Sequence, residues 1–128
     1  MRGAVMVIIA TAVLGCVSGT ASAQTMPLNE FIRTADRIPR NPTALLRRDY
    51  HRLKREAEAA MSVVLTDQYR AQQASRPSQT CMPMERFTFN PEDILRRLKA
   101  IPEAQRRRMT ITEGLREVMR RLYPCPGG

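Results

Sequence analysis

Apolar residues recur at intervals of three and four positions in four separate stretches of this chain, and this spacing limits the folds open to it. Residues spaced in this way share one face of an α-helix. The stretches cover residues 28–38, 42–74, 91–101 and 111–122. We therefore predict an all-α domain of four helices, each burying one apolar stripe.

Helix start signals agree with these stretches. Asn-Pro pairs occur at residues 41–42 and 90–91. In each pair asparagine is a favoured N-cap residue and proline is favoured at the first helical position. Thr110 and Glu113 have the spacing of a capping box. The stretch 42–74 alone predicts a helix about 50 Å long. Because that length exceeds the span of a compact small domain, we expect a bend, with residues 62–66 the weakest helix formers, or an overhanging end.

The N-terminus has the pattern of a secretory signal peptide. Arg2 precedes an uncharged, mostly aliphatic run over residues 4–14, and Ala21-Ser22-Ala23 is a small-residue cleavage site. The apolar run is shorter than the roughly 20 residues that a membrane-spanning helix needs. We predict that residues 1–23 are removed, that residues 24–128 form a single domain, and that the protein is periplasmic or secreted.

The sequence contains three cysteines, and processing changes how many remain. Cys16 lies within the predicted signal peptide. Val13-Leu14-Gly15-Cys16 loosely resembles a bacterial lipobox, so lipidation of Cys16 is the alternative to ordinary cleavage. Cys81 and Cys125 remain, and two cysteines in an oxidising compartment most simply form one disulfide. They lie far apart and not in a C-x-x-C pair, which disfavours a catalytic redox role.

The chain is strongly basic, with 21 lysine and arginine residues against 12 acidic ones and a formal net charge of +9. Few aromatic residues are interleaved with the basic ones, so we expect no nucleic-acid partner. The charge predicts either a surface for lipid headgroups, anionic envelope polymer or an acidic protein, or a solvated surface that keeps a small protein soluble. The candidate surface consists of two clusters: Arg47, Arg48, Arg52 and Arg55, beside Lys54, and Arg106, Arg107 and Arg108.

Residues suited to catalysis or to a cofactor are scarce. His51 is the only histidine and lies among the arginines of the first cluster, so we interpret it as part of a solvated face rather than a general base or zinc ligand. After residue 23, glycine occurs only at positions 114, 127 and 128, which excludes a glycine-rich phosphate loop. We expect Gly114 to let a neighbouring backbone approach the last helix. We predict no enzymatic activity, no metal and no cofactor.

The second half of the chain has a distinctive pattern: Cys81-x-Pro83, then Asn90 before Ile94-Leu95, and finally Tyr123-Pro124-Cys125. This pattern resembles the C-terminal half of the Rap/Tai-type immunity proteins. That family consists of small helical periplasmic proteins of Gram-negative bacteria, which neutralise the peptidoglycan-cutting amidase effectors of type VI secretion. The resemblance implies a Cys81–Cys125 disulfide and an effector amidase as partner.

The first half departs from that family, which usually has a further cysteine and a glycine-containing helix there. No motif in this chain marks inhibitory contacts. The chain is also similar to uncharacterised secreted proteins of alphaproteobacteria, over the first two predicted helices as well.

These observations leave two leading functions. One is a secreted or periplasmic binding protein that inhibits an enzyme, as an immunity protein does. The other is a basic envelope-associated protein that holds anionic polymer or lipid through its arginine clusters. A secreted helical domain without a fixed ligand remains a third alternative.

Overall fold

The computed structural model describes residues 26–85 and 88–126, and within them the fold is all-helical, as predicted. The predicted signal peptide and Cys16 lie outside the described residues. Two short elements, η1 and α4, accompany the four main helices. The elements are α1 (Leu28–Asp36), the 3₁₀-helix η1 (Pro42–Leu46), α2 (Arg48–Gln73), α3 (Pro91–Ala100), α4 (Glu103–Arg106) and α5 (Ile111–Leu122).

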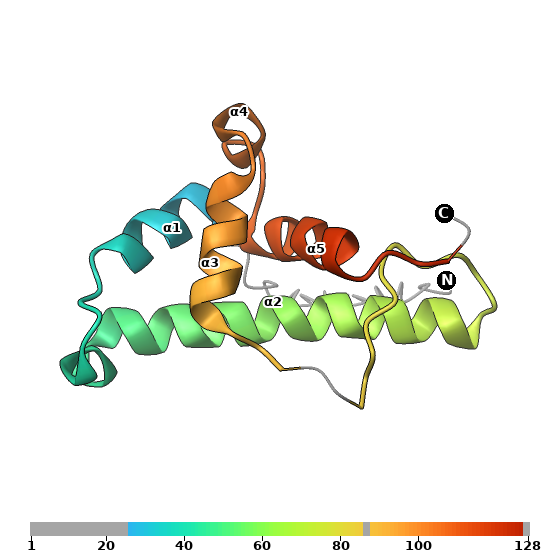
Figure 1. Ribbon diagram of the computed structural model, residues 1–128, viewed down its shortest axis with the longest axis horizontal. Coiled ribbons are helices and arrows are strands. Elements are labelled where there is room, and N and C mark those ends of the chain that lie inside the picture. Colours follow the sequence, from blue (N-terminus) through green and yellow to red (C-terminus); the bar gives the residue numbers. More distant parts are fainter. Residues whose placement is uncertain (1–25, 86–87, 127–128) are drawn as a thin grey trace, which may run out of the picture.

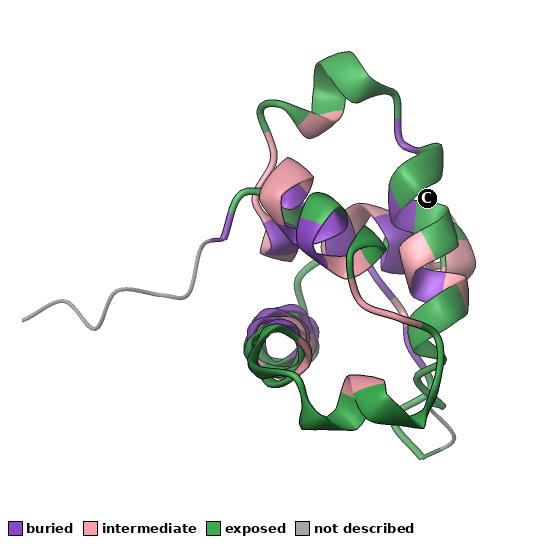
Figure 2. Ribbon diagram, turned by 90° about the vertical axis from the view of Figure 1, so that its left-hand side faces the viewer, coloured by how far each residue is buried: buried purple, intermediate pink, exposed green. Residues whose placement is uncertain are grey.

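The long helix α2 forms the base of the molecule in Figure 1, where α1 and α5 pack on it and α3 packs against α5 and α1. Their apolar stripes meet in one core, seen as the buried inner faces in Figure 2. The largest fully buried apolar side chains are those of Leu28, Leu98, Ile101, Ile111, Leu115, Met119 and Val64. The core therefore draws on every main helix, and α3 is held in place through α5 and α1.

Both predicted start signals in the second half are confirmed. The Asn90 side chain accepts hydrogen bonds from the backbone N–H groups of Glu92 and Asp93, at 3.1 and 3.2 Å. Thr110 and Glu113 form a reciprocal capping box at the start of α5. These caps satisfy donors that a helix N-terminus otherwise leaves unpaired.

The prediction of one helix from residue 42 onward is wrong. Asn41 caps η1, where its side chain accepts from the Thr43 N–H at 3.0 Å, and the chain turns extended at Arg47 before α2 begins. His51 Nε2 donates to the Leu45 carbonyl at 2.7 Å and so replaces a bond that a continuous helix would have made there. Beyond this break α2 runs for 26 residues, about 39 Å, without interruption at residues 62–66.

Gly114 lies at the point where α1, α3 and α5 meet. A Cβ atom at this position would lie 2.9 Å from Leu28 Cδ2 and 3.1 Å from Leu98 Cδ2. The expected close neighbour was a backbone segment, but the actual neighbours are two fully buried leucine side chains. A larger residue at this position would therefore require the Leu28 and Leu98 side chains to shift within a closely packed core.

Candidate functional site

The disulfide joins the loop before α3 to the segment after α5. Cys81 and Cys125 are bonded, with their Cα atoms 5.0 Å apart, as the sequence predicts. The backbone N–H of Cys81 also donates to the Tyr123 carbonyl at 2.9 Å. The two chain segments are thus held together by a covalent bond and a hydrogen bond at the same place.

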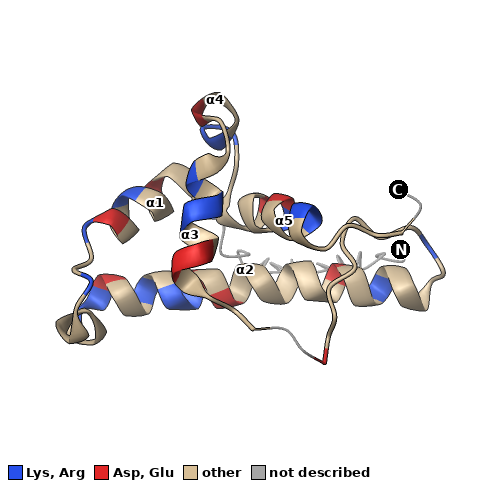
Figure 3. Ribbon diagram, viewed as in Figure 1, with Lys and Arg blue, Asp and Glu red and all other residues tan. Residues whose placement is uncertain are grey.

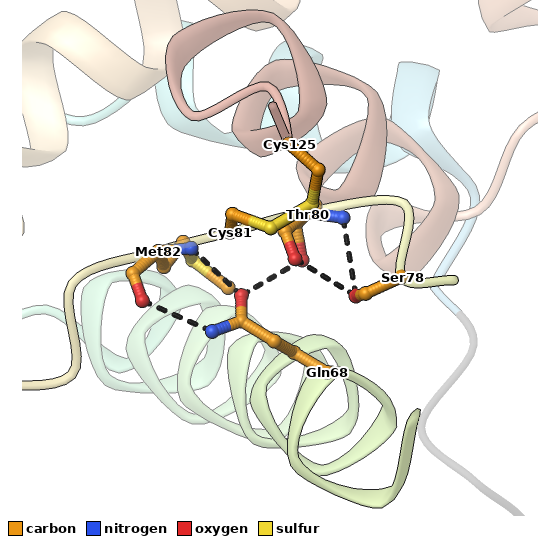
Figure 4. The surroundings of a disulfide bond; sticks show 6 residues. All are labelled: Gln68, Ser78, Thr80, Cys81, Met82 and Cys125. Carbon is orange, nitrogen blue, oxygen red and sulfur yellow. Dashed lines mark hydrogen bonds between the residues drawn. A yellow bond between two sulfur atoms is a disulfide. The ribbon is translucent and has the colours of Figure 1, made fainter. Parts of the chain in front are cut away.

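Gln68 fastens this loop to α2, and sequence reasoning did not identify it. Its side chain, only 1% exposed, points from α2 into the loop (Figure 4). The amide oxygen accepts from Thr80 Oγ1 at 3.0 Å and from the Met82 N–H at 2.8 Å, while the amide nitrogen donates to the Met82 carbonyl at 3.0 Å. We call this arrangement the Gln68 clamp. The only signal for it in the sequence is a polar residue on the apolar face of α2.

The main concave feature is an apolar groove bordered by α1, α2 and α3, with η1 and Phe89 at its edge. Its volume is about 820 Å³. The floor is continuous with the core at Leu98 and Leu115. The walls are formed by the apolar side chains of Phe31, Ile38, Leu53, Ala57, Met61, Leu65 and Leu95.

Charged residues line only parts of this groove. Lys54 and Glu58 form an ion pair with a 3.7 Å separation across one turn of α2, and Arg40 and Glu92 complete the charged lining. The groove thus has an apolar interior bordered by charges of both signs. A second apolar stripe on α2 could have indicated the groove from the sequence. It consists of Ala57, Met61 and Leu65, which are spaced four residues apart.

The two arginine clusters do not form one surface. The first lies at the start of α2, whereas the second lies on and after α4, at the far end of α3 (Figures 1 and 3). Arg52 pairs with Glu30 of α1 at 2.8 Å, and Arg107 pairs with Glu103 at 3.0 Å. Within the described part of the chain, no ion pair is formed by Arg47, Arg48, Arg55, Arg106 or Arg108.

Two carboxylates are held charged by arginines. The hydrogen bond from Arg97 is the main cause that lowers the pKa of Asp93 below its ordinary value of 3.8. Burial raises the pKa of Glu117, but hydrogen bonds from Arg120 and Arg121 outweigh burial and lower that pKa below 4.5. Both carboxylates therefore favour the charged form and neither is tuned for proton transfer near neutral pH.

We expect replacement of Glu117 by glutamine to flatten the acid dependence of stability. Because the pKa of Glu117 is lower in the folded state, its ion pairs add stability above pH 4.5 that is lost as the pH falls through the folded-state value. Urea unfolding at a series of pH values below 4.5 measures this loss. An identical acid dependence in E117Q would contradict the expectation.

No group of three or more histidine, cysteine, aspartate or glutamate side chains suited to a metal ion occurs among the described residues. In the same residues, no helix is long and apolar enough to cross a membrane. The single histidine, His51, is exposed and bonded to Leu45 in the turn between η1 and α2.

Comparison of the chain with known protein families, with curated proteins and with solved structures gives no match.

Proposed function

We propose that this is a non-enzymatic binding protein that acts in the periplasm or outside the cell, and that it binds a partner protein in the groove between α1, α2 and α3. The observation that carries the proposal is the groove itself, an open apolar hollow of about 820 Å³ on a disulfide-bonded scaffold. Burial of such a surface is the main driving force for protein association. Charges of both signs along the groove favour a protein over a uniformly anionic polymer.

The partner we propose is a peptidoglycan amidase effector, and the protein is then its inhibitor. The resemblance of residues 81–125 to Rap/Tai-type immunity proteins supports this choice. The predicted secretion signal supports it too, because such an effector acts on peptidoglycan outside the cytoplasm. In this proposal the groove receives an apolar segment of the enzyme, and no chemistry by this chain is needed.

Affinity capture tests the proposal. The oxidised, processed protein is used as bait in extracts of its own cells at low and high salt, and bound material is identified by mass spectrometry. We expect one stoichiometric protein partner that survives high salt, since apolar contacts are not screened by ions. Failure of every protein to remain bound at high salt would overturn the proposal.

A charge placed in the groove should weaken this binding. Leu65 lies half-buried in the groove wall, so Leu65→Glu would put a carboxylate against the partner's apolar surface. We expect at least about tenfold weaker binding, measured by titration with the captured partner. Val63→Glu is the matched control, because Val63 is 39% exposed on the same helix but does not line the groove. Equal affinity of both variants would exclude the groove as the site.

The runner-up function is a basic envelope-associated protein that binds anionic polymer or lipid. The observation in its favour is that Arg47, Arg48 and Arg55 are exposed and form no ion pair within the described residues. The capture experiment separates the two functions. Recovery of envelope material alone, lost at high salt, would favour the basic surface, because exposed charges are screened beyond about 8–10 Å.

A further inference from the structure

The tip of η1 exposes two adjacent leucines. Leu45 is 56% exposed and Leu46 is 85% exposed, the largest exposed fraction among the described large hydrophobic residues. The short coil of η1 projects at one end of the molecule, beside the start of α2 (Figure 1). In Figure 2 the same segment lies at the edge of the fold and is mostly exposed. Two neighbouring leucines on a projecting turn are therefore available for insertion into an apolar phase.

Cations flank these leucines on both sides. Arg40 precedes η1, and Arg47 and Arg48 directly follow it; all three are exposed and form no ion pair in the described ranges. Between residues 40 and 52 the only acidic residue is Asp49, and His51 is held in the turn by its bond to Leu45. The tip therefore combines an apolar end with a net positive base.

Several backbone groups of the tip are already hydrogen-bonded. The Leu45 carbonyl accepts from His51, the Thr43 N–H donates to Asn41, and the Arg47 N–H donates to the Ala44 carbonyl at 3.0 Å. Unpaired backbone groups are costly to move into a lipid environment. These bonds lower the cost of moving the tip into the interfacial region of a bilayer.

We propose that η1 is a docking tip for anionic membranes, with Leu45 and Leu46 entering the interface and Arg40, Arg47 and Arg48 contacting the lipid phosphates. Charge complementarity with anionic lipid selects this occupant. A partner protein at the same tip is the competing outcome. Two leucines and three arginines amount to a small contact, so the docking is reversible and sensitive to salt. Leu45, Leu46, Arg47 and Arg48 do not line the groove, although Arg40 lies at its edge, and the proposal does not depend on the groove's function.

Vesicle flotation tests the docking. The processed protein, with its N-terminus verified by mass spectrometry to be free of signal peptide and lipid, is mixed with vesicles of phosphatidylcholine or of equimolar phosphatidylcholine and phosphatidylglycerol. We expect binding to the anionic vesicles only. Because one arginine near an anionic surface contributes about a fivefold change in binding, Arg47→Gln combined with Arg48→Gln should weaken binding about 25-fold. The charge-matched control, Arg107→Gln with Arg108→Gln, should remain close to the parent.

Insertion is distinguished from simple charge attraction by a fluorescent probe. The chain contains no tryptophan, so Leu46→Trp places a single indole at the tip. We expect its emission to shift to the blue on anionic vesicles, and that of the control Val63→Trp to remain unchanged. Leu45→Ser combined with Leu46→Ser should weaken vesicle binding at least about tenfold.

Three results would overturn the proposal. The first is unaltered vesicle binding by the double serine variant, and the second is equal loss of binding in both arginine pairs, since each would indicate general charge attraction. The third is absence of binding to anionic vesicles by the parent protein; if the double serine variant then also loses a captured protein, the tip is assigned to that protein instead. If affinity capture finds no protein bound in the groove, the proposed function fails, but the vesicle results still test the docking tip.

Discussion

Replacing both Cys81 and Cys125 with serine is expected to lower the free energy of unfolding by about 4 kcal/mol. The disulfide closes a loop across a sequence separation of 44, and the cross-link restricts the unfolded chain more strongly than the folded one. A loss of that size is a large fraction of the stability of a small domain. The folded population should therefore fall sharply near physiological temperature.

Urea unfolding followed by circular dichroism measures this loss. Wild-type protein under reducing conditions is the matched comparison and should be destabilised to a similar extent. Equal midpoints for the oxidised wild type and the double serine variant would contradict the expectation. The single variant Cys81→Ser also tests the absence of thiol catalysis, because a structural cysteine affects stability whereas a nucleophile affects activity at full stability.

Replacing Gln68 with leucine is expected to cost about 3 kcal/mol, at roughly 1 kcal/mol for each of the three hydrogen bonds that are lost. Leucine has a similar volume, so the change removes the polar contacts rather than opening a large cavity. It also leaves the buried Met82 N–H and carbonyl without their partner. The loop that contains Cys81 should consequently detach from α2 more readily.

Gln72→Leu provides the control, because Gln72 lies one turn further along α2 and is exposed. Its urea midpoint should stay close to that of the wild type, whereas the midpoint of Gln68→Leu should fall clearly. Because the Gln68 clamp and the disulfide hold the same loop, the two losses should not add when combined. Additive losses, or a wild-type midpoint for Gln68→Leu, would show that the clamp does not secure the loop.

Local signals were sufficient for most of the secondary structure. The caps at Asn90 and Thr110 were predicted correctly because a capping side chain bonds to backbone groups only two or three residues away. The signal at Asn41 was also a true cap, but it starts a 3₁₀ turn instead of the long helix. The turn is accompanied by the bond from His51 to Leu45, which spans six residues and has no pattern of its own in the sequence.

The candidate site was much less predictable. Ala57, Met61 and Leu65 form an apolar stripe that looks the same in the sequence whether another helix covers it or not. Only the positions of α1 and α3 leave these residues lining a groove. Likewise, the sequence contains two separate arginine-rich stretches, at residues 47–55 and 106–108. Only the fold shows that these stretches lie far apart in space (Figure 3).

The sequence by itself determined the helical class, the four main helices and the pairing of Cys81 with Cys125. These depend on apolar spacing, on capping residues and on the presence of two cysteines after residue 23. The tertiary structure alone decided the break at Arg47, the Gln68 clamp, the groove and the exposed tip of η1. The break at Arg47 goes with a bond that spans only six residues, whereas the clamp, the groove and the exposed tip depend on which segments from elsewhere in the chain cover α2 and η1, and local propensity does not encode which faces of a helix are covered.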